Sequence, residues 1–157
     1  VILPLAMATT FTLSSVATAA DVKVIWSDPD SYTDIRQASS DTKSSFDRRV
    51  SSQLEGHIAK LAKVLPEDQK LVMNFTNVAL AGNVDAIRGT DSVRVVQGNN
   101  YPARLAFDYA LSDAAGNVLK QGSEDLKSST ATVRTARDEA FGIEKKVLTN
   151  WFKKTFK

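Results

Sequence analysis

The alternation of apolar and polar residues is clearest between residues 70 and 82. One face of a strand here would carry three large apolar side chains, Leu71, Met73 and Phe75, because residues two positions apart share a face. Beyond Thr76 the alternation slips by one position, and Val78 and Leu80 become the large apolar residues. A slip of one position turns every later side chain to the other face. The pattern therefore predicts either a β-bulge near Thr76 and Asn77 or the end of the strand there.

Three other segments alternate with the period of a strand, at residues 22–26, 103–111 and 118–126. The last two are separated by a short polar connection that contains Gly116, a residue free to adopt a positive φ. This connection predicts an antiparallel hairpin.

Two segments have the period of an amphipathic helix. Between Ser44 and Leu65 apolar residues recur every three or four positions, and Pro66 ends the pattern because proline disfavours helical geometry in the preceding residue. The helical period returns after Thr130, and between residues 140 and 152 it gives a broad apolar side with lysines outside it.

These elements predict a single α+β domain, since 157 residues suffice for one core but not comfortably for two. The hairpin makes at least part of the sheet antiparallel, and each helix has one apolar side to bury. We therefore expect a two-layer sandwich, with two helices on one face of a mainly antiparallel sheet of four or five strands.

Residues 82–102 form a long polar connection that is rich in glycine and asparagine, with 93–96 as a candidate short edge strand. Connections of this length are more often functional than tight turns are. Arg88 and Arg94 lie in it and Arg104 follows, and bidentate hydrogen bonds from them could bind an anionic partner. With Asn77 at the break of the strand, these are the candidate partner-binding residues. The composition favours the alternative of a solvated loop, in which surface charges contribute little.

Composition excludes several kinds of chemistry. The chain has no cysteine, which removes disulfides, thiol catalysis and cysteine-based zinc sites, and its one histidine, His57, leaves little for a histidine-rich metal site. The formal net charge of +2 gives no electrostatic argument for nucleic acid. No nucleophile elbow, phosphate loop or metal-ligand spacing is present. We expect no catalytic, cofactor or metal residues.

Three aspartates before the first helix, Asp28, Asp30 and Asp34, could supply oxygens to a calcium ion. The glycine and the distal glutamate of a calcium-binding hand are missing, so we interpret them as turn and capping residues. His57 borders the apolar side of the first helix, and we expect it to be half-buried and bonded to backbone or a carboxylate. Glu144 lies near the apolar side of the last helix and could pair with a lysine or arginine.

The first 20 residues carry no charge and are mainly apolar, as in a secretory signal. Ala17-Thr18-Ala19 has the small residues that signal peptidase accepts, so we expect residues 1–19 to be a signal peptide without its start and residues 20–157 to be the mature domain. The alternative of a membrane anchor fits less well, because the threonines and serines make the segment polar for a span of about 20 residues. Export without cysteine suggests the periplasm of a Gram-negative bacterium.

Several short segments in order carry a resemblance to a known family. They are 24–29 with 32–35, Leu65-Pro66 with 76–82, 101–105, and 144–152. Together they resemble the family catalogued as domain of unknown function 3016, small exported proteins of proteobacteria. The resemblance covers nearly all of the mature chain and implies its location and extent, but no activity and no catalytic residue.

Three hypotheses for function follow from the sequence. The first is a non-catalytic binding or accessory protein of the cell envelope, whose partner is a protein or another envelope component. The second is a small periplasmic hydrolase with a site assembled from scattered polar residues. The third is a membrane-surface protein that acts through its lysine-bearing last helix. The same helix pattern also fits docking on the sheet, which we favour.

Overall fold

The computed structural model describes residues 19–135 and 139–157. Its main sheet has four strands in the order β1-β2-β5-β6, with bounds Asp21–Trp26, Lys70–Ala79, Arg104–Ser112 and Val118–Lys127. β1 is parallel to β2, and the other two pairs are antiparallel. The predicted hairpin of β5 and β6 is confirmed, and the predicted signal peptide lies outside the described residues except for its last position.

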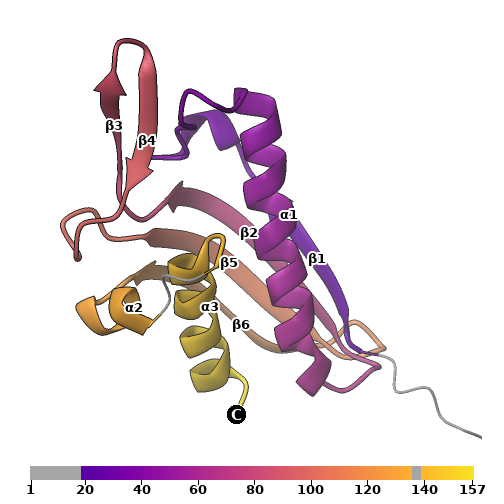
Figure 1. Cartoon of the computed structure of the whole chain (residues 1–157). Coiled ribbons are helices and arrows are strands. Elements are labelled where there is room, and N and C mark those ends of the chain that lie inside the picture. The colour runs from indigo at the N-terminus through magenta and orange to yellow at the C-terminus, as the bar shows by residue number, and fades with distance from the viewer. Residues whose placement is uncertain (1–18, 136–138) are drawn as a thin grey trace, which may run out of the picture.

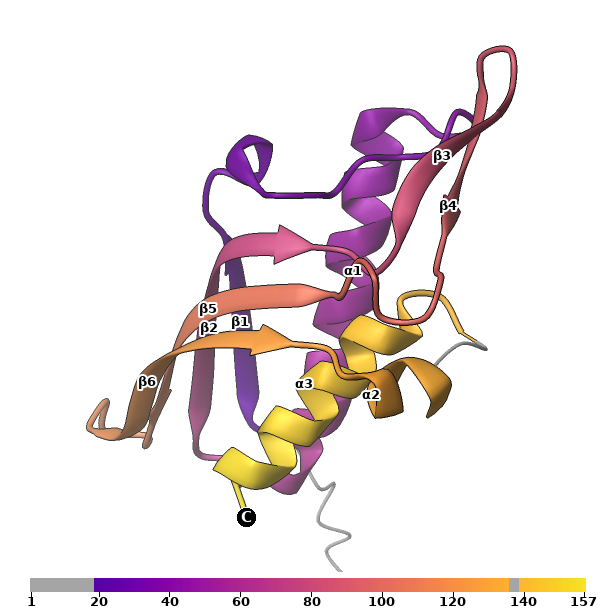
Figure 2. The same cartoon turned by 90° about the vertical axis from the view of Figure 1, so that its left-hand side faces the viewer.

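Two long helices, α1 (Lys43–Leu61) and α3 (Gly142–Thr155), cover the same face of this sheet (Figures 1 and 2). The α+β sandwich expected from the sequence is therefore confirmed. Three shorter helices complete the fold: η1 (Pro29–Ser31), η2 (Ala62–Val64) and α2 (Thr130–Thr135). Within the described residues no helix has the length and apolar character needed to cross a membrane.

The core is organised around a row of aromatic rings that runs across both layers. Phe75 stacks on Trp26 at 4.5 Å and lies 5.1 Å from Phe107, which in turn meets Trp151 of α3 at 4.7 Å. Phe75 and Phe107 are at most 1% exposed. Each such pair contributes about 0.5–1.5 kcal/mol beyond its buried area. The alternation of the sequence thus places one continuous apolar layer between the sheet and the helices.

The opposite face of the sheet is polar, and no helix of the described residues lies over it (Figure 2). Asn74 and Asp108 are opposite each other in the register, and Asp108 is opposite Ser123. Ser27 donates to the Asn74 side chain at 2.6 Å, and Ser123 donates to Asp108 at 2.5 Å. Side-chain hydrogen bonds therefore satisfy many of the polar groups on this face, which needs no apolar layer over it.

A β-bulge interrupts the pairing of β2 with β5 between Phe75 and Asn77. This confirms the bulge predicted from the slip in the alternation. Residues before it, such as Phe75, and residues after it, such as Val78, are both buried although they are three positions apart. The extra residue is therefore what allows β2 to continue to Ala79 with both halves facing the core.

Residues 82–102 differ from the polar loop expected from the sequence. They contain a hairpin of β3 (Asn83–Arg88) and β4 (Asp91–Val95), which forms a separate two-stranded sheet. The hairpin projects away from the main sheet (Figure 1). Its side chains are mostly exposed or half-buried. A strand with neither face in the core has no clear hydrophobic alternation, which is why β3 was missed.

Gly82 sits where β2 turns into the hairpin, with a φ of +84°. A Cβ atom built here would lie 2.3 Å from the backbone oxygen of Val95. Because this oxygen belongs to the backbone, it cannot move aside as the end of a flexible side chain could. Glycine is therefore required at the root of the hairpin, both for its φ and for the close approach of β4.

We expect Gly82→Ala to destabilise the protein by more than about 3 kcal/mol, because the substitution adds a backbone clash to the cost of a positive φ. Gly89→Ala is the matched control, since Gly89 also has a positive φ (+58°) but nothing within 4 Å of its Cβ position. The control should lose only about 1–2 kcal/mol. Urea unfolding of both variants measures the difference, and equal losses would contradict the role given to the close approach.

Candidate functional site

The hairpin is held to the main domain by an ion pair between Asp34 and Arg94. Arg94 Nη2 donates to Asp34 Oδ1 at 3.1 Å and to the backbone oxygen of Arg36 at 2.7 Å. Its Nη1 donates to the backbone oxygen of Gly82 at 3.2 Å. Both side chains are only 17% exposed. One guanidinium thus joins β4, the root of the hairpin and the segment that follows η1.

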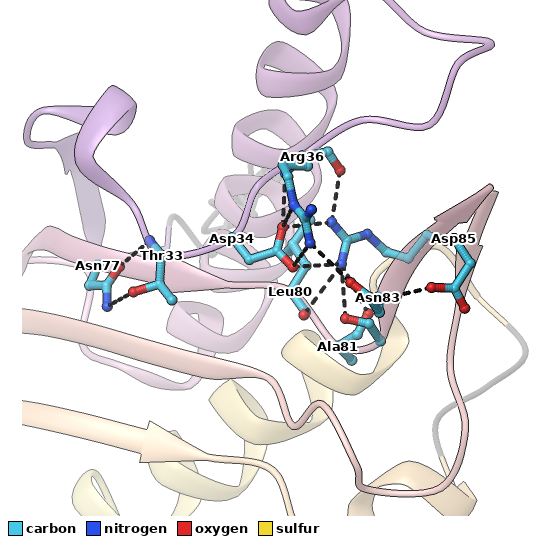
Figure 3. Close-up of polar contacts among 10 residues, drawn as sticks. Thr33, Asp34, Arg36, Asn77, Leu80, Ala81, Asn83 and Asp85 are labelled. Carbon is cyan, nitrogen blue, oxygen red and sulfur yellow. Dashed lines mark hydrogen bonds and ion pairs between the residues drawn. The ribbon is translucent and has the colours of Figure 1, made fainter. Parts of the chain in front are cut away.

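The position of Asp34 follows from the bulge in β2. After β1 ends at Trp26 the chain leaves the sheet, and it returns at Asp34, which forms a parallel bridge with Ala79. Asn77, beside the bulge, fixes this return with both ends of its amide: its oxygen accepts from Thr33 N and its nitrogen donates to the Thr33 hydroxyl, each at 2.8 Å (Figure 3). The bulge therefore places the carboxylate of Asp34 beneath the hairpin.

Two further contacts fasten the hairpin along the same segment. Arg36 Nη2 donates to the Asn83 side chain at 3.0 Å at the start of β3. Near the tip, the backbone nitrogen of Ser92 donates to the Ser39 hydroxyl at 2.8 Å, and Ser39 N donates to the Ser92 hydroxyl at 3.0 Å. Residues 34–39 thus support the hairpin from its root to its turn.

The arginines determine the charge state of Asp34. Burial by itself would raise the pKa of this carboxyl, but hydrogen bonds from Arg36 and Arg94 outweigh it and hold the pKa below its usual value. Asp34 is therefore ionised at neutral pH when the hairpin is in place. Breaking this partly buried pair from one side leaves a poorly compensated charge, at a cost below the about 3–5 kcal/mol of a fully buried pair.

A second buried acid, Glu144, fixes the root of the hairpin from the opposite layer. It is 3% exposed, and its Oε1 accepts a 2.7 Å hydrogen bond from Ala81 N. Burial raises the pKa of Glu144. Its neighbour Lys145 is 8% exposed and donates to Gln53 of α1 at 2.9 Å. The first turn of α3 is thereby tied to β2 and to α1.

A groove of about 550 Å³ lies between these elements. Its wall is largely apolar, and it includes Phe46, Val96, Phe141 and Ile143 beside Arg94 and Glu144. Phe141 has a φ of 55°, an unusual conformation for a bulky residue. The charged groups that line the groove already bond to protein atoms: Arg49 to Asp41, Arg94 to Asp34, Glu139 to Lys145, and Glu144 to Ala81. The charged groups of the groove are therefore engaged in contacts within the protein.

The four residues singled out from the sequence have different surroundings. Asn77 and Arg94 make the structural contacts described above, while Arg104 pairs with Asp125 at 2.7 Å between β5 and β6. Arg88 is exposed at the end of β3. Only Arg88 is therefore free to meet a partner without loss of a contact shown here. Their assignment to partner binding stays a prediction.

The other candidate groups are also separated. Asp34 pairs with arginines and Asp30 with Lys43, and the described residues hold no group of three or more His, Asp or Glu side chains that could share a metal ion. His57 is half-buried as expected; its Nε2 lies 2.8 Å from the hydroxyl of Thr149, and the backbone of Lys145 is a second hydrogen-bond partner. Burial lowers the pKa of His57.

The last helix is docked on the sheet, as favoured from its pattern. Ile143, Val147, Leu148, Trp151 and Phe152 are all at most 6% exposed. Membrane-surface binding by this helix would require those side chains to leave the core. The exposed large apolar residues lie elsewhere, and Ile87 (63%) and Val93 (39%) are on the hairpin.

The sequence missed the importance of Asp34 and Glu144. The sequence pattern is typical of a turn or capping residue at Asp34, whereas the deciding feature is an arginine 60 positions later that only the fold brings near. The signal for Glu144 was its place beside the apolar stripe of the last helix, but its partner is a backbone nitrogen rather than a cation.

We expect the buried Glu144 to make stability depend on pH. The pKa is raised on folding, so the contribution is complete below the unfolded value of about 4.3 and is lost as pH rises through the folded value. Glu144→Gln keeps an acceptor for Ala81 N but cannot ionise, so its free energy of unfolding should fall less than that of the parent above this pH.

Urea unfolding at several pH values measures the effect. Glu139→Gln is the matched control, because it is the same chemical change on a side chain that is 63% exposed, where its ion pair with Lys145 is open to solvent. A parent and a Glu144→Gln variant with parallel pH profiles would contradict the prediction.

Comparison with known proteins adds the family to this description. The model of the family described as "Protein of unknown function (DUF3016)" matches residues 20–154. No curated protein and no solved structure gives a significant match. The match covers most of the chain, as the resemblance of its short segments implied. The chain therefore belongs to the DUF3016 family.

Proposed function

We propose that this is an exported periplasmic protein that acts without catalysis, as a binding or accessory protein of the cell envelope. The β3–β4 hairpin is its docking arm. A partner protein or envelope component binds the exposed side chains near the hairpin turn, including Ile87 and Arg88.

The observation that carries this proposal is how firmly an otherwise exposed hairpin is held. A two-stranded hairpin is marginally stable in water. This one buries an ion pair, at a cost in desolvation, and adds the contacts of Asn83 and Ser92. Burial of core side chains does not explain that arrangement, because β3 and β4 have few. Fixing the direction of an arm does explain it.

The aliphatic side chain of Ile87 is suited to the contact. It is 63% exposed and lies where the register of β3 and β4 shifts between Ala86 and Arg88. Burying an isoleucine in an interface contributes about 1.5–3 kcal/mol. The neighbouring Arg88 adds a cation that can form bidentate bonds with a carboxylate or phosphate.

Export is supported by the first 20 residues, which have an uncharged apolar segment and small residues before Ala20. The family match begins at the same position. The absence of cysteine is compatible with folding in an oxidising compartment without disulfides.

We expect Ile87→Asp to reduce capture of the partner roughly tenfold or more, since a carboxylate cannot be buried in an apolar contact without a large penalty. Val64→Asp is the matched control, because Val64 is also an exposed aliphatic residue (75%) but lies in η2. Affinity capture from a periplasmic extract with quantitative mass spectrometry measures the effect.

Thermal melting of both variants checks the fold. Arg94→Ala is unsuitable as a binding test, because it would release the hairpin. If Ile87→Asp captures the same proteins as the parent at an unchanged melting temperature, the hairpin is not the docking arm.

We expect the mature protein to begin at Ala20. Intact-mass analysis of the protein released by osmotic shock from cells that express the full precursor measures this. A protein that stays in the cytoplasm, or one that keeps residues 1–19 after export, would contradict the proposed signal peptide.

A further inference from the structure

The outer edge of β6 is open. β6 is the last strand of the main sheet, and among the described residues no other strand pairs with its free side. It is ten residues long, against six for β1 at the other edge. Val118 and Leu119, at its start, are 55% and 51% exposed. A long edge with exposed apolar residues is a template for another strand.

A groove of about 420 Å³ runs beside this edge, between β6 and α3. Its floor contains Tyr109, Leu126, Val147 and Trp151. Gly122 leaves the centre of the strand without a side chain, and a Cβ atom there would lie 3.1 Å from the Tyr109 ring. Side chains of an added strand would therefore find apolar surface on the side that faces α3.

The charged residues that line the groove indicate which kind of segment could bind there. Lys120, Lys127 and Lys154 line it, and Glu124 is the one acidic residue that does. Lys127 and Lys154 form no ion pair with any described residue, while Lys120 donates to the backbone oxygen of Thr155 at 2.5 Å. Two cations beside an open strand edge therefore lack a counter-charge.

The register shows which positions of an added strand would meet these lysines. Lys120, Gly122 and Glu124 lie opposite core residues of β5, so they point to the side that the helices cover. Alternate side chains of an extended segment would face the same side. Acidic residues at every second position would thus approach Lys120 and Lys154. The intervening residues lie beside the polar open face, the side of Lys127, which is opposite the exposed Arg104 of β5.

We propose that the edge of β6 and the groove between β6 and α3 bind an extended acidic segment of a partner protein, which adds to the sheet as a fifth strand. Backbone hydrogen bonds supply affinity, and the lysines select for carboxylates at alternate positions. A second copy of this chain fits less well, because it would bring its own lysines to the same edge. The inference is independent of the hairpin, which shares no residue with this groove.

The probe is a labelled decapeptide of alternating glutamate and threonine, measured by fluorescence anisotropy on the mature protein. We expect it to bind, and the peptide with lysine in place of glutamate not to bind. Lys154→Glu should weaken binding about tenfold or more. Lys153→Glu is the matched control, with the same change of charge on the same helix at a residue that does not line the groove.

Backbone methylation tests whether the segment adds as a strand. One peptide carries N-methyl groups on all threonines and another on all glutamates. Only one set of amides faces β6 in an added strand, so one peptide should lose about tenfold or more in affinity and the other should keep it.

Three results would overturn the inference: no binding of the acidic peptide, equal binding of both methylated peptides, or equal effects of the two lysine variants. Binding to anionic lipid vesicles without binding of the peptide would assign the lysines to a membrane instead. A dimer that forms in sedimentation and is abolished by Lys154→Glu would assign the edge to a second copy. Ile87→Asp should leave peptide binding unchanged, because the hairpin shares no residue with the groove. Failure of this inference would therefore not contradict the role proposed for the hairpin.

Discussion

The pairing of Asp34 with Arg94 is the interaction on which the peripheral part of the fold depends. An isolated hairpin with mostly exposed side chains cannot hold its direction by hydrophobic burial. Here the guanidinium of Arg94 donates hydrogen bonds to oxygens of Asp34, Arg36 and Gly82, which belong to separate parts of the chain. The desolvation that this costs is offset by bonds to most of the nitrogens, although Nε has no partner among the described residues.

The ion pair depends in turn on a backbone irregularity in β2. Without the bulge between Phe75 and Asn77, either the first or the second half of the strand would turn its apolar side chains to water. With it, both halves face the core, and the Asn77 amide is available to hold Thr33 next to Asp34. A local solution to packing thus also determines where the hairpin is attached.

The sequence predicted the features that repeat along the chain and missed those that depend on distant residues. Alternation and helical period identified the strands and helices of the sandwich, and the slip near Thr76 identified the bulge. β3 was missed because neither of its faces is buried deeply enough to leave a pattern. The role of Arg94 was missed for another reason: its partners lie far away in the sequence, and a solvated arginine and a buried one look alike there. Strand order was equally inaccessible, because no local pattern encodes it.

Helix α3 connects the two surfaces to which we assign binding. Its first turn holds Ala81 through Glu144, and about two and three turns later Trp151 and Lys154 form part of the wall of the β6 groove. The position of the helix is fixed by the hydrogen bond from Lys145 to Gln53 of α1 and by the aromatic contacts of Trp151. Since one rigid element carries both attachments, a partner on the β6 edge and a partner on the hairpin would be held in a defined relative position. A single partner that contacted both surfaces at once would bind more tightly than through either alone, because the second contact would form at a high effective concentration.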